Sequence, residues 1–305
     1  MDSTASTSTL KTRLMPTTAL FRHDLRTLSG SWLVRLWLAA TAILTLFLLT
    51  ANWGQFQTAT LIASMLFPYL VFPWFLVAVV LGVAPVSGAQ ADALADGFLS
   101  RPVTRYEYLI AAWAARVFTV VGIFLLVIVP AIVLVVFANR PVAEETVTLY
   151  GILGSLIVVS LVLTLLVSLG FLLGTLLRRP LLAVVVLIFV WFPINMILHT
   201  FSLEEFSPIS LNQAIPTLLR QPWNETEVES QNPLGDHDAE MVARQAAYVM
   251  NFLSGEPAPP PPSKDGFFEQ NNYDDFSLGR VLLGYGIPTL AAVALALLSF
   301  CSRDL

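Results

Sequence analysis

The chain has little charge, one cysteine and two lysines. Charged residues make up 12% of its 305 residues, whereas a soluble globular protein carries about 25%. Together with 56% apolar residues and a mean hydropathy of +0.74, this low charge excludes an ordinary soluble domain and indicates a membrane protein. A single cysteine, Cys301, excludes an intramolecular disulfide and a cysteine-rich metal site.

Motifs for common enzymatic chemistry are also missing. Neither Lys11 nor Lys264 lies in a Gly-x-x-x-x-Gly-Lys-Ser/Thr loop, so the chain has no Walker-type phosphate-binding loop. The three histidines lie far apart, and none belongs to a His-Glu-x-x-His helix. We therefore expect no enzymatic activity and no cofactor bound by this chain.

Six apolar runs are each about 20 residues long or more, which lets a helix cross a hydrocarbon core of about 30 Å. They lie at residues 32–51, 59–83, 117–138, 147–177, 181–198 and 281–301. Barrel strands alternate polar and apolar residues, so these continuous runs exclude a transmembrane barrel. The sequence predicts an all-α integral membrane protein with one six-span domain over residues 32–305.

Basic residues gather in alternate connections between these runs. They are Lys11, Arg13, Arg22, Arg26, Arg35, Arg101, Arg105, Arg116, Arg178 and Arg179. Under the positive-inside rule we expect a multi-pass protein of the cell (inner) membrane with both termini in the cytoplasm. The opposite side then holds an extracytoplasmic insertion at residues 199–279, of which residues 201–279 contain thirteen of the 21 acidic residues.

A tail and a helix are predicted ahead of the first span. Residues 1–15 begin with a Ser/Thr-rich stretch and are expected to be a disordered cytosolic tail. Residues 16–31 predict an amphipathic helix that either lies in the headgroup region or packs on the bundle as a cap. Its apolar side consists of Phe21, Leu25, Leu28 and Trp32, and its polar side includes Arg22, Asp24 and Arg26.

The extracytoplasmic insertion is long and rich in proline. Residues 206–223 predict one or two short helices that enter the outer leaflet. Residues 238–254 predict an amphipathic helix, and residues 256–262 predict an extended polyproline linker.

Between the second and third runs, residues 84–116 combine charge with turn and helix-start signals. Thr104 and Glu107 have the spacing of a capping box, so the third span is predicted to begin at Thr104 and to continue through Arg116. The segment is either a rigid element that docks on a partner or an ordinary loop whose arginines follow the positive-inside rule.

Residues 97–109 carry a resemblance to a known family. They read Gly-Phe-Leu-Ser-Arg-Pro-Val-Thr-Arg-Tyr-Glu-Tyr-Leu and resemble the Leu-Leu-Ser-Arg-Pro-Val-Ser-Arg-x-Glu-Tyr-Leu stretch of type-2 ABC exporter permeases. Residues 21–26 resemble the interfacial "elbow" helix of the same family. The chain departs from the family in its acidic, proline-rich insertion and at Ala111 and Ala112, where a Gly-Lys pair is common.

The resemblance implies a permease subunit of an ABC transporter. Its coupling helix, within residues 92–105, would sit in a cleft of a separate nucleotide-binding ATPase subunit, which binds ATP and Mg. A second permease copy or a paralogue and membrane lipid are the other partners implied, with no nucleic acid. The candidate partner-binding residues are Asp92, Asp96, Gly97, Ser100, Arg101, Pro102, Thr104, Arg105 and Glu107.

Two other functions stay open from the sequence. One is a membrane scaffold or sensor whose acidic extracytoplasmic loop binds a partner. The other is a channel or transporter that needs no ATP, although the predicted spans lack the Asp, Glu and His residues typical of ion-coupled transporters.

Overall fold

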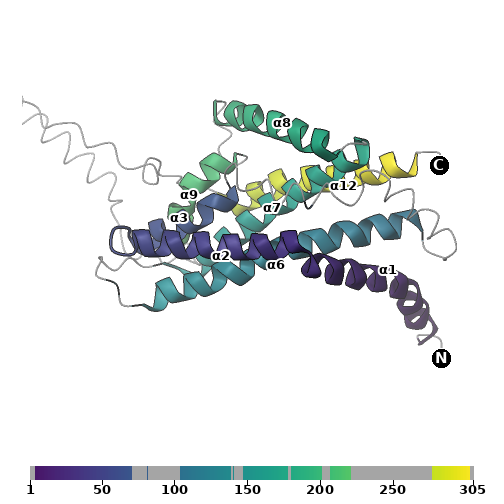
Figure 1. The fold of residues 1–305 in the computed structure, drawn as a ribbon, viewed down its shortest axis with the longest axis horizontal. Coiled ribbons are helices and arrows are strands. Elements are labelled where there is room, and N and C mark those ends of the chain that lie inside the picture. Colours follow the sequence, from purple (N-terminus) through teal and green to yellow (C-terminus); the bar gives the residue numbers. More distant parts are fainter. Residues whose placement is uncertain are drawn as a thin grey trace, which may run out of the picture.

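The computed structural model describes residues 4–70, 81, 104–138, 140, 147–177, 180–200, 207–220 and 277–302. All regular secondary structure in these ranges is helical (Figure 1). The helices are α1 (Thr4–Gly30), α2 (Trp32–Asn52), α3 (Thr58–Leu70), α6 (Arg105–Phe137), α7 (Leu149–Leu176), α8 (Pro180–Thr200), α9 (Pro208–Arg220) and α12 (Leu278–Cys301).

Four of the described helices, α2, α6, α7 and α12, are long and apolar enough to cross a membrane. Of the other two predicted spans, α3 covers the first part of residues 59–83 and α8 covers residues 181–198. The apolar stretches described in them, Thr58–Leu70 and Leu181–Trp191, are shorter than a span of about 20 residues. The all-helical, multi-span architecture agrees with the sequence, whereas six spans stay a prediction.

The boundaries of α1 differ from the prediction at one end. The helix begins at Thr4, so it includes most of residues 1–15, for which the composition predicts a disordered tail. Leu, Lys, Arg and Met between residues 10 and 15 have high helix propensity, which favours this extension. The helix ends at Gly30, one residue before the predicted end at residue 31, and the Ser31 hydroxyl then caps α2 by accepting from the Val34 N–H at 3.3 Å.

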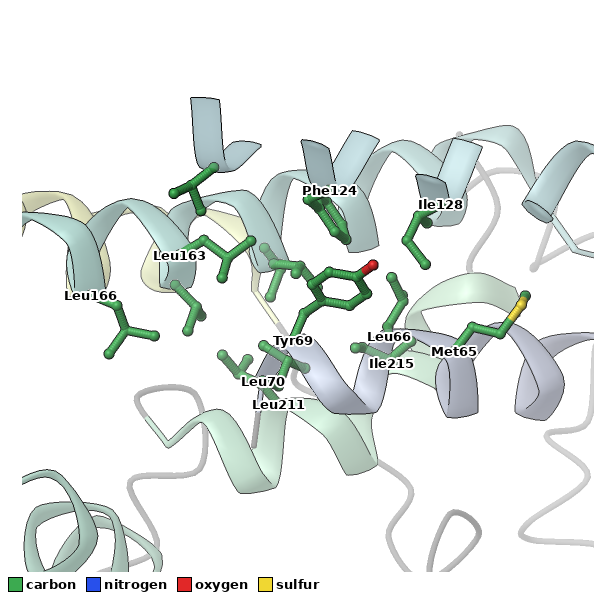
Figure 2. Close-up of a cluster of buried hydrophobic side chains, with 14 of the residues drawn as sticks. Met65, Leu66, Tyr69, Leu70, Phe124, Ile128, Leu163, Leu166, Leu211 and Ile215 are labelled. Atoms are coloured by element: carbon green, nitrogen blue, oxygen red, sulfur yellow. The ribbon is translucent and has the colours of Figure 1, made fainter. Parts of the chain in front are cut away.

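The centre of the bundle is α3. Every side chain from residue 59 to residue 66 is buried, because α2, α6, α7 and α9 all pack against this helix. Tyr69 lies edge-to-face on Phe124 of α6, with ring centroids 4.9 Å apart. Figure 2 shows Tyr69 surrounded by Leu66 and by Ile215 of α9. Helix α9 is therefore part of the core.

The bundle has two distinct ends, because α7 and α12 run side by side in the same direction. Leu278 at the start of α12 lies beside Gly154 near the start of α7. Near their other ends, Ala296 packs in one apolar cluster with Phe171. We call the end with α1 and the start of α6 the α1 end, and the end with α9 and the start of α7 the α9 end (Figure 1).

Candidate functional site

The candidate site lies at the α1 end, where the predicted coupling segment leads into α6. Of the predicted partner-binding residues, the structure describes Thr104, Arg105 and Glu107. The remaining ones lie outside the described residues. They are Asp92, Asp96, Gly97, Ser100, Arg101 and Pro102. The predicted helix at 238–254 and the linker at 256–262 lie outside the described residues as well.

Thr104 and Glu107 form the capping box that the sequence predicts. Thr104 has an extended backbone with φ −76° and ψ 150°, and its Oγ1 accepts from the Glu107 N–H at 3.3 Å. In return, Glu107 Oε2 accepts from the Thr104 N–H at 3.0 Å. Both hydrogen bonds satisfy N–H groups that have no partner within the helix. The start of α6 is therefore fixed at one residue, and its position is confirmed.

From this cap, α6 continues without interruption for 33 residues. At 1.5 Å per residue, such a helix is about 50 Å long. The hydrocarbon core of a bilayer is about 30 Å thick, so α6 is long enough to cross it and still extend about 20 Å beyond. One helix thus includes both the capped start and an apolar stretch that can cross a membrane.

The first turns of α6 pack against the last turns of α7 and α12. Leu109 and Ala112 of α6 are buried in the cluster that contains Phe171 and Ala296. Packed interiors have few voids, so neighbouring helices resist independent displacement. A movement of the start of α6 would therefore act on α7 and α12.

A hydrogen bond between side chains strengthens this contact. Trp113 Nε1 donates to Ser168 Oγ on α7 at 2.9 Å. Ser168 donates in turn to the Thr164 carbonyl at 2.7 Å. No motif in the sequence predicts this pair, although a Trp beside an apolar run is a signal for a residue that needs a polar partner.

Helix α1 lies against α6 and α2. Phe21 meets Phe118 of α6 edge-to-face, with ring centroids 6.0 Å apart and an interplanar angle of 79°. Leu25 and Leu28, one and two turns further on, are half-buried. Of the two placements that the sequence leaves open, this packing favours the cap on the bundle.

The predicted sides of α1 need two corrections: Asp24, predicted on the polar side, is half-buried, and Trp32, predicted on the apolar side, is exposed. Arg22 and Arg26 are exposed. Trp32, however, is 78% exposed and does not continue the buried side of α1. The helical spacing that joins Leu28 to Trp32 in the prediction is interrupted, because α1 ends at Gly30 and Trp32 is the first residue of α2.

Asp24 and Arg116 bring opposite charges together where α1 crosses α6. Arg116 is 7% exposed, and its guanidinium donates to the Ala112 carbonyl. Burial raises the pKa of the half-buried Asp24 carboxyl above its usual 3.8, and the positive charge of Arg116 offsets part of this rise. In the sequence, Arg116 serves only as a basic residue that indicates which side of the membrane its segment faces. Its position beside Asp24 could not be predicted, because it depends on how α1 and α6 cross.

At the α9 end, Arg140 joins the chain after α6 to the turn between α2 and α3. Its guanidinium donates to the Trp53 carbonyl, at 2.8 Å from Nη2, and also to the Phe56 carbonyl. The guanidinium carbon lies 5.3 Å from the centroid of the Trp53 ring, within the range of a cation–π interaction.

Helix α9 occurs within residues 206–223, where short helices were predicted, and it packs against α3, α7 and α8. Its last turn is held by α7. The Leu219 carbonyl accepts from the Thr148 N–H at 2.9 Å and from Thr148 Oγ1 at 3.3 Å. Gly151 permits this approach, because a Cβ atom there would lie 2.3 Å from the Leu218 carbonyl oxygen.

Polar side chains are buried in the first half of α9 and at Ser207, the residue before it. Ser207 and Asn212 are 0% exposed, and Ser210 is 1% exposed. Neither hydroxyl, and neither polar atom of the Asn212 amide, has a hydrogen-bond partner in the described part of the chain. Leaving a buried polar group unpaired costs about 1–3 kcal/mol.

Comparison with known proteins finds no matching family and no matching curated protein. Within the described ranges, no three His, Cys, Asp or Glu side chains are grouped so that they could hold a metal ion.

Proposed function

We propose that the chain is the permease subunit of an ABC transporter, specifically an exporter. In this proposal two copies of the chain, or one copy and a paralogue, assemble with two ATPase subunits in the cell (inner) membrane. Both termini and residues 84–116 face the cytoplasm. ATP and Mg bind to the ATPase subunits, which hydrolyse the nucleotide, so the chain itself is not an enzyme.

The observation that carries this proposal is the continuity of α6. The helix starts at the Thr104 cap and extends as one element to Phe137, with an apolar stretch able to cross a bilayer. A force applied at the Thr104 cap would reach the apolar stretch along a single helix. Such continuity is what a subunit needs if its energy comes from another protein.

The proposed cycle makes use of the contacts between α6 and α7. ATP binding closes the ATPase subunits and displaces the coupling segment, with Gly97 and Pro102 setting its bend. Helix α6 moves with the segment, and the Trp113–Ser168 hydrogen bond transmits the movement to α7. The pathway between the two permease subunits then opens outward.

Contact with the ATPase is assigned to the charged residues of the segment. They are Asp92, Asp96, Arg101 and Arg105. Charge-assisted hydrogen bonds of this kind contribute about 1.5–3 kcal/mol each when they are well ordered. Reversal of two of these charges should therefore be enough to release the partner.

The test is affinity purification of the tagged chain from native membranes. Arg101→Glu combined with Arg105→Glu should abolish co-purification of a subunit that contains a Walker loop, identified by mass spectrometry. The matched control combines Lys11→Glu with Arg13→Glu, which makes the same change of charge on the same predicted side of the membrane. The control should retain the ATPase, and both variants should keep the thermal midpoint of the parent chain.

Two outcomes would contradict the proposal. One is that the Arg101/Arg105 variant retains as much ATPase as the control. The other is that the purified chain, reconstituted alone in liposomes, transports a solute without ATP.

A further inference from the structure

Helix α1 has one apolar side, and that side is already occupied by the bundle. Phe21 meets Phe118 of α6 edge-to-face, and Leu25 and Leu28 are half-buried. An amphipathic helix that enters the headgroup region of a membrane does so with its apolar side. Because this side of α1 packs on protein, contact of the helix with lipid must involve its exposed, polar side.

The exposed side of α1 is basic and has no acidic partner in the described part of the chain. Arg22 and Arg26 are exposed and one helical turn apart, so they lie on the same side of the helix. The described ranges contain only two acidic residues, Asp24 and Glu107. Asp24 lies half-buried with the charge of Arg116 nearby, and Glu107 belongs to the cap of α6. The charge of Arg22 and Arg26 is therefore not neutralised within these ranges.

The exposed surface changes in composition where α1 leads into α2. After Arg22 and Arg26 comes Trp32, the first residue of α2, which is 78% exposed. Large exposed apolar side chains follow along α2, among them Leu36 and Phe47. Tryptophan side chains gather at the membrane–water interface, between the headgroups and the hydrocarbon. Since α2 is long and apolar enough to cross a membrane, this order places the basic side of α1 at the level of the headgroups.

A third arginine lies just beyond Trp32. Arg35, in the first turn of α2, is exposed and is the one charged residue of that helix. A long arginine side chain near the end of a membrane helix extends toward the headgroups and keeps its stem in apolar surroundings. Its guanidinium can therefore reach the same level of the membrane as Arg22 and Arg26.

We propose that Arg22, Arg26 and Arg35 bind the headgroups of anionic phospholipid in the leaflet at the α1 end, with Trp32 at the boundary to the acyl chains. A planar guanidinium donates two parallel hydrogen bonds to a phosphate. Each basic residue near an anionic membrane surface raises the affinity about fivefold. A zwitterionic lipid contains the same phosphate, but its own cation offsets the charge. The site needs neither ATP nor the partner subunits proposed above.

Native mass spectrometry of the full chain in detergent tests the site, with phosphatidylglycerol and phosphatidylcholine added separately. The parent chain should bind phosphatidylglycerol at least about tenfold more tightly than phosphatidylcholine. Arg22→Gln combined with Arg26→Gln should weaken binding of phosphatidylglycerol at least about tenfold and leave binding of phosphatidylcholine unchanged. The matched control combines Arg220→Gln with Arg280→Gln, which removes the same charge from exposed arginines at the α9 end. The control should bind both lipids as the parent does.

Two further variants test the cause of the preference. Arg22→Lys combined with Arg26→Lys keeps the charge, so its affinity for phosphatidylglycerol should stay within about threefold of the parent. Arg35→Gln removes one charge and should lower this affinity about fivefold. A loss in the lysine variant as large as that in the glutamine variant would exclude charge as the cause.

Two results would overturn the proposal itself. One is equal affinity of the parent chain for phosphatidylglycerol and phosphatidylcholine. The other is that the Arg22/Arg26 glutamine variant, with the thermal midpoint of the parent, binds phosphatidylglycerol as tightly as the control does. The basic side of α1 would then point to an acidic protein segment as its partner.

Discussion

The indole N–H of Trp113 donates a hydrogen bond to the hydroxyl of Ser168 at 2.9 Å and thereby joins α6 to α7. Ser168 is 0% exposed and donates its own proton to the Thr164 carbonyl, so its hydroxyl has both a donor and an acceptor partner. Trp113 packs against the apolar cluster at the α1 end that contains Leu109 and Phe171. The hydrogen bond joins two helices that are each long and apolar enough to cross a membrane.

Replacement of the Trp113 indole by a phenyl ring should remove the hydrogen bond to Ser168 and keep most of the apolar packing. Trp113→Phe keeps an aromatic ring but removes the donor, so the free energy of unfolding should fall by about 0.5–1.5 kcal/mol. Thermal unfolding followed by intrinsic fluorescence measures the change, with Trp32→Phe as control because Trp32 is 78% exposed. A double-mutant cycle with Ser168→Ala should give a non-zero coupling energy; strictly additive effects would refute the pairing.

Gly151 should tolerate no larger side chain. In Gly151→Ala the new Cβ would lie 2.3 Å from the Leu218 oxygen and 2.5 Å from the Leu219 Cα, both backbone atoms, so α9 must shift. We expect a loss of about 1–3 kcal/mol in stability. Gly122→Ala is the matched control, because nothing lies within 4 Å of its Cβ position, and it should be neutral or slightly stabilising. Equal melting temperatures for the two variants would show that α9 is not seated on α7 in this way.

Loss of the α6 cap should loosen the start of the helix. Thr104→Ala removes the oxygen that accepts from Glu107 N–H and should cost about 1 kcal/mol of local stability. Hydrogen exchange followed by mass spectrometry should then show exchange about fivefold faster in a peptide covering residues 105–108, with little change further along α6. Glu107→Gln can still accept from the Thr104 N–H, so its exchange should stay close to that of the parent. Unchanged exchange in Thr104→Ala would argue against the cap.

The Asp24 carboxyl should make the contact between α1 and α6 depend on pH. Because burial raises its pKa above 3.8, the folded chain holds this proton more tightly than the unfolded chain does. The resulting stabilisation is fully present below about pH 3.8 and is lost as the pH rises through the folded-state pKa. Asp24→Asn cannot ionise, so its thermal midpoint should exceed that of the parent at pH 7, and the difference should shrink toward pH 4. If the difference in thermal midpoint between Asp24→Asn and the parent stays constant from pH 7 to pH 4, ionisation of Asp24 is not the cause of the pH dependence.

Features that depend on neighbouring residues were predictable from the sequence. The Thr104–Glu107 cap joins residues three apart in the chain, and the end of α1 at Gly30 follows from a local helix-stop signal. The half-buried side of α1 follows from spacing at the helical period. The apolar runs of α2, α6, α7 and α12 likewise predicted helices of membrane-crossing length. Each depends on interactions within one turn or on composition.

Contacts between distant segments were not predictable in the same way. Trp113 and Ser168 are 55 residues apart, Thr148 and Leu219 are 71 apart, and Arg140 and Trp53 are 87 apart. The helical period shows which side of a helix is apolar, but nearly every side of α3 and α7 is apolar, so it cannot select their neighbours. Trp32 illustrates the same limit, because one break at Ser31 removed it from the side that its spacing suggested.

The sequence by itself determined that the chain is helical and apolar, where its main helices begin, and that α6 starts at a capped residue outside its apolar run. Only the tertiary structure decided that α1 packs on α6, that Trp113 bonds to Ser168, and that Ser210 and Asn212 of α9 are buried without a hydrogen-bond partner among the described residues. The physical reason is range. Caps and helical periods involve groups within four residues of one another, whereas packing depends on which faces of separate helices come into contact.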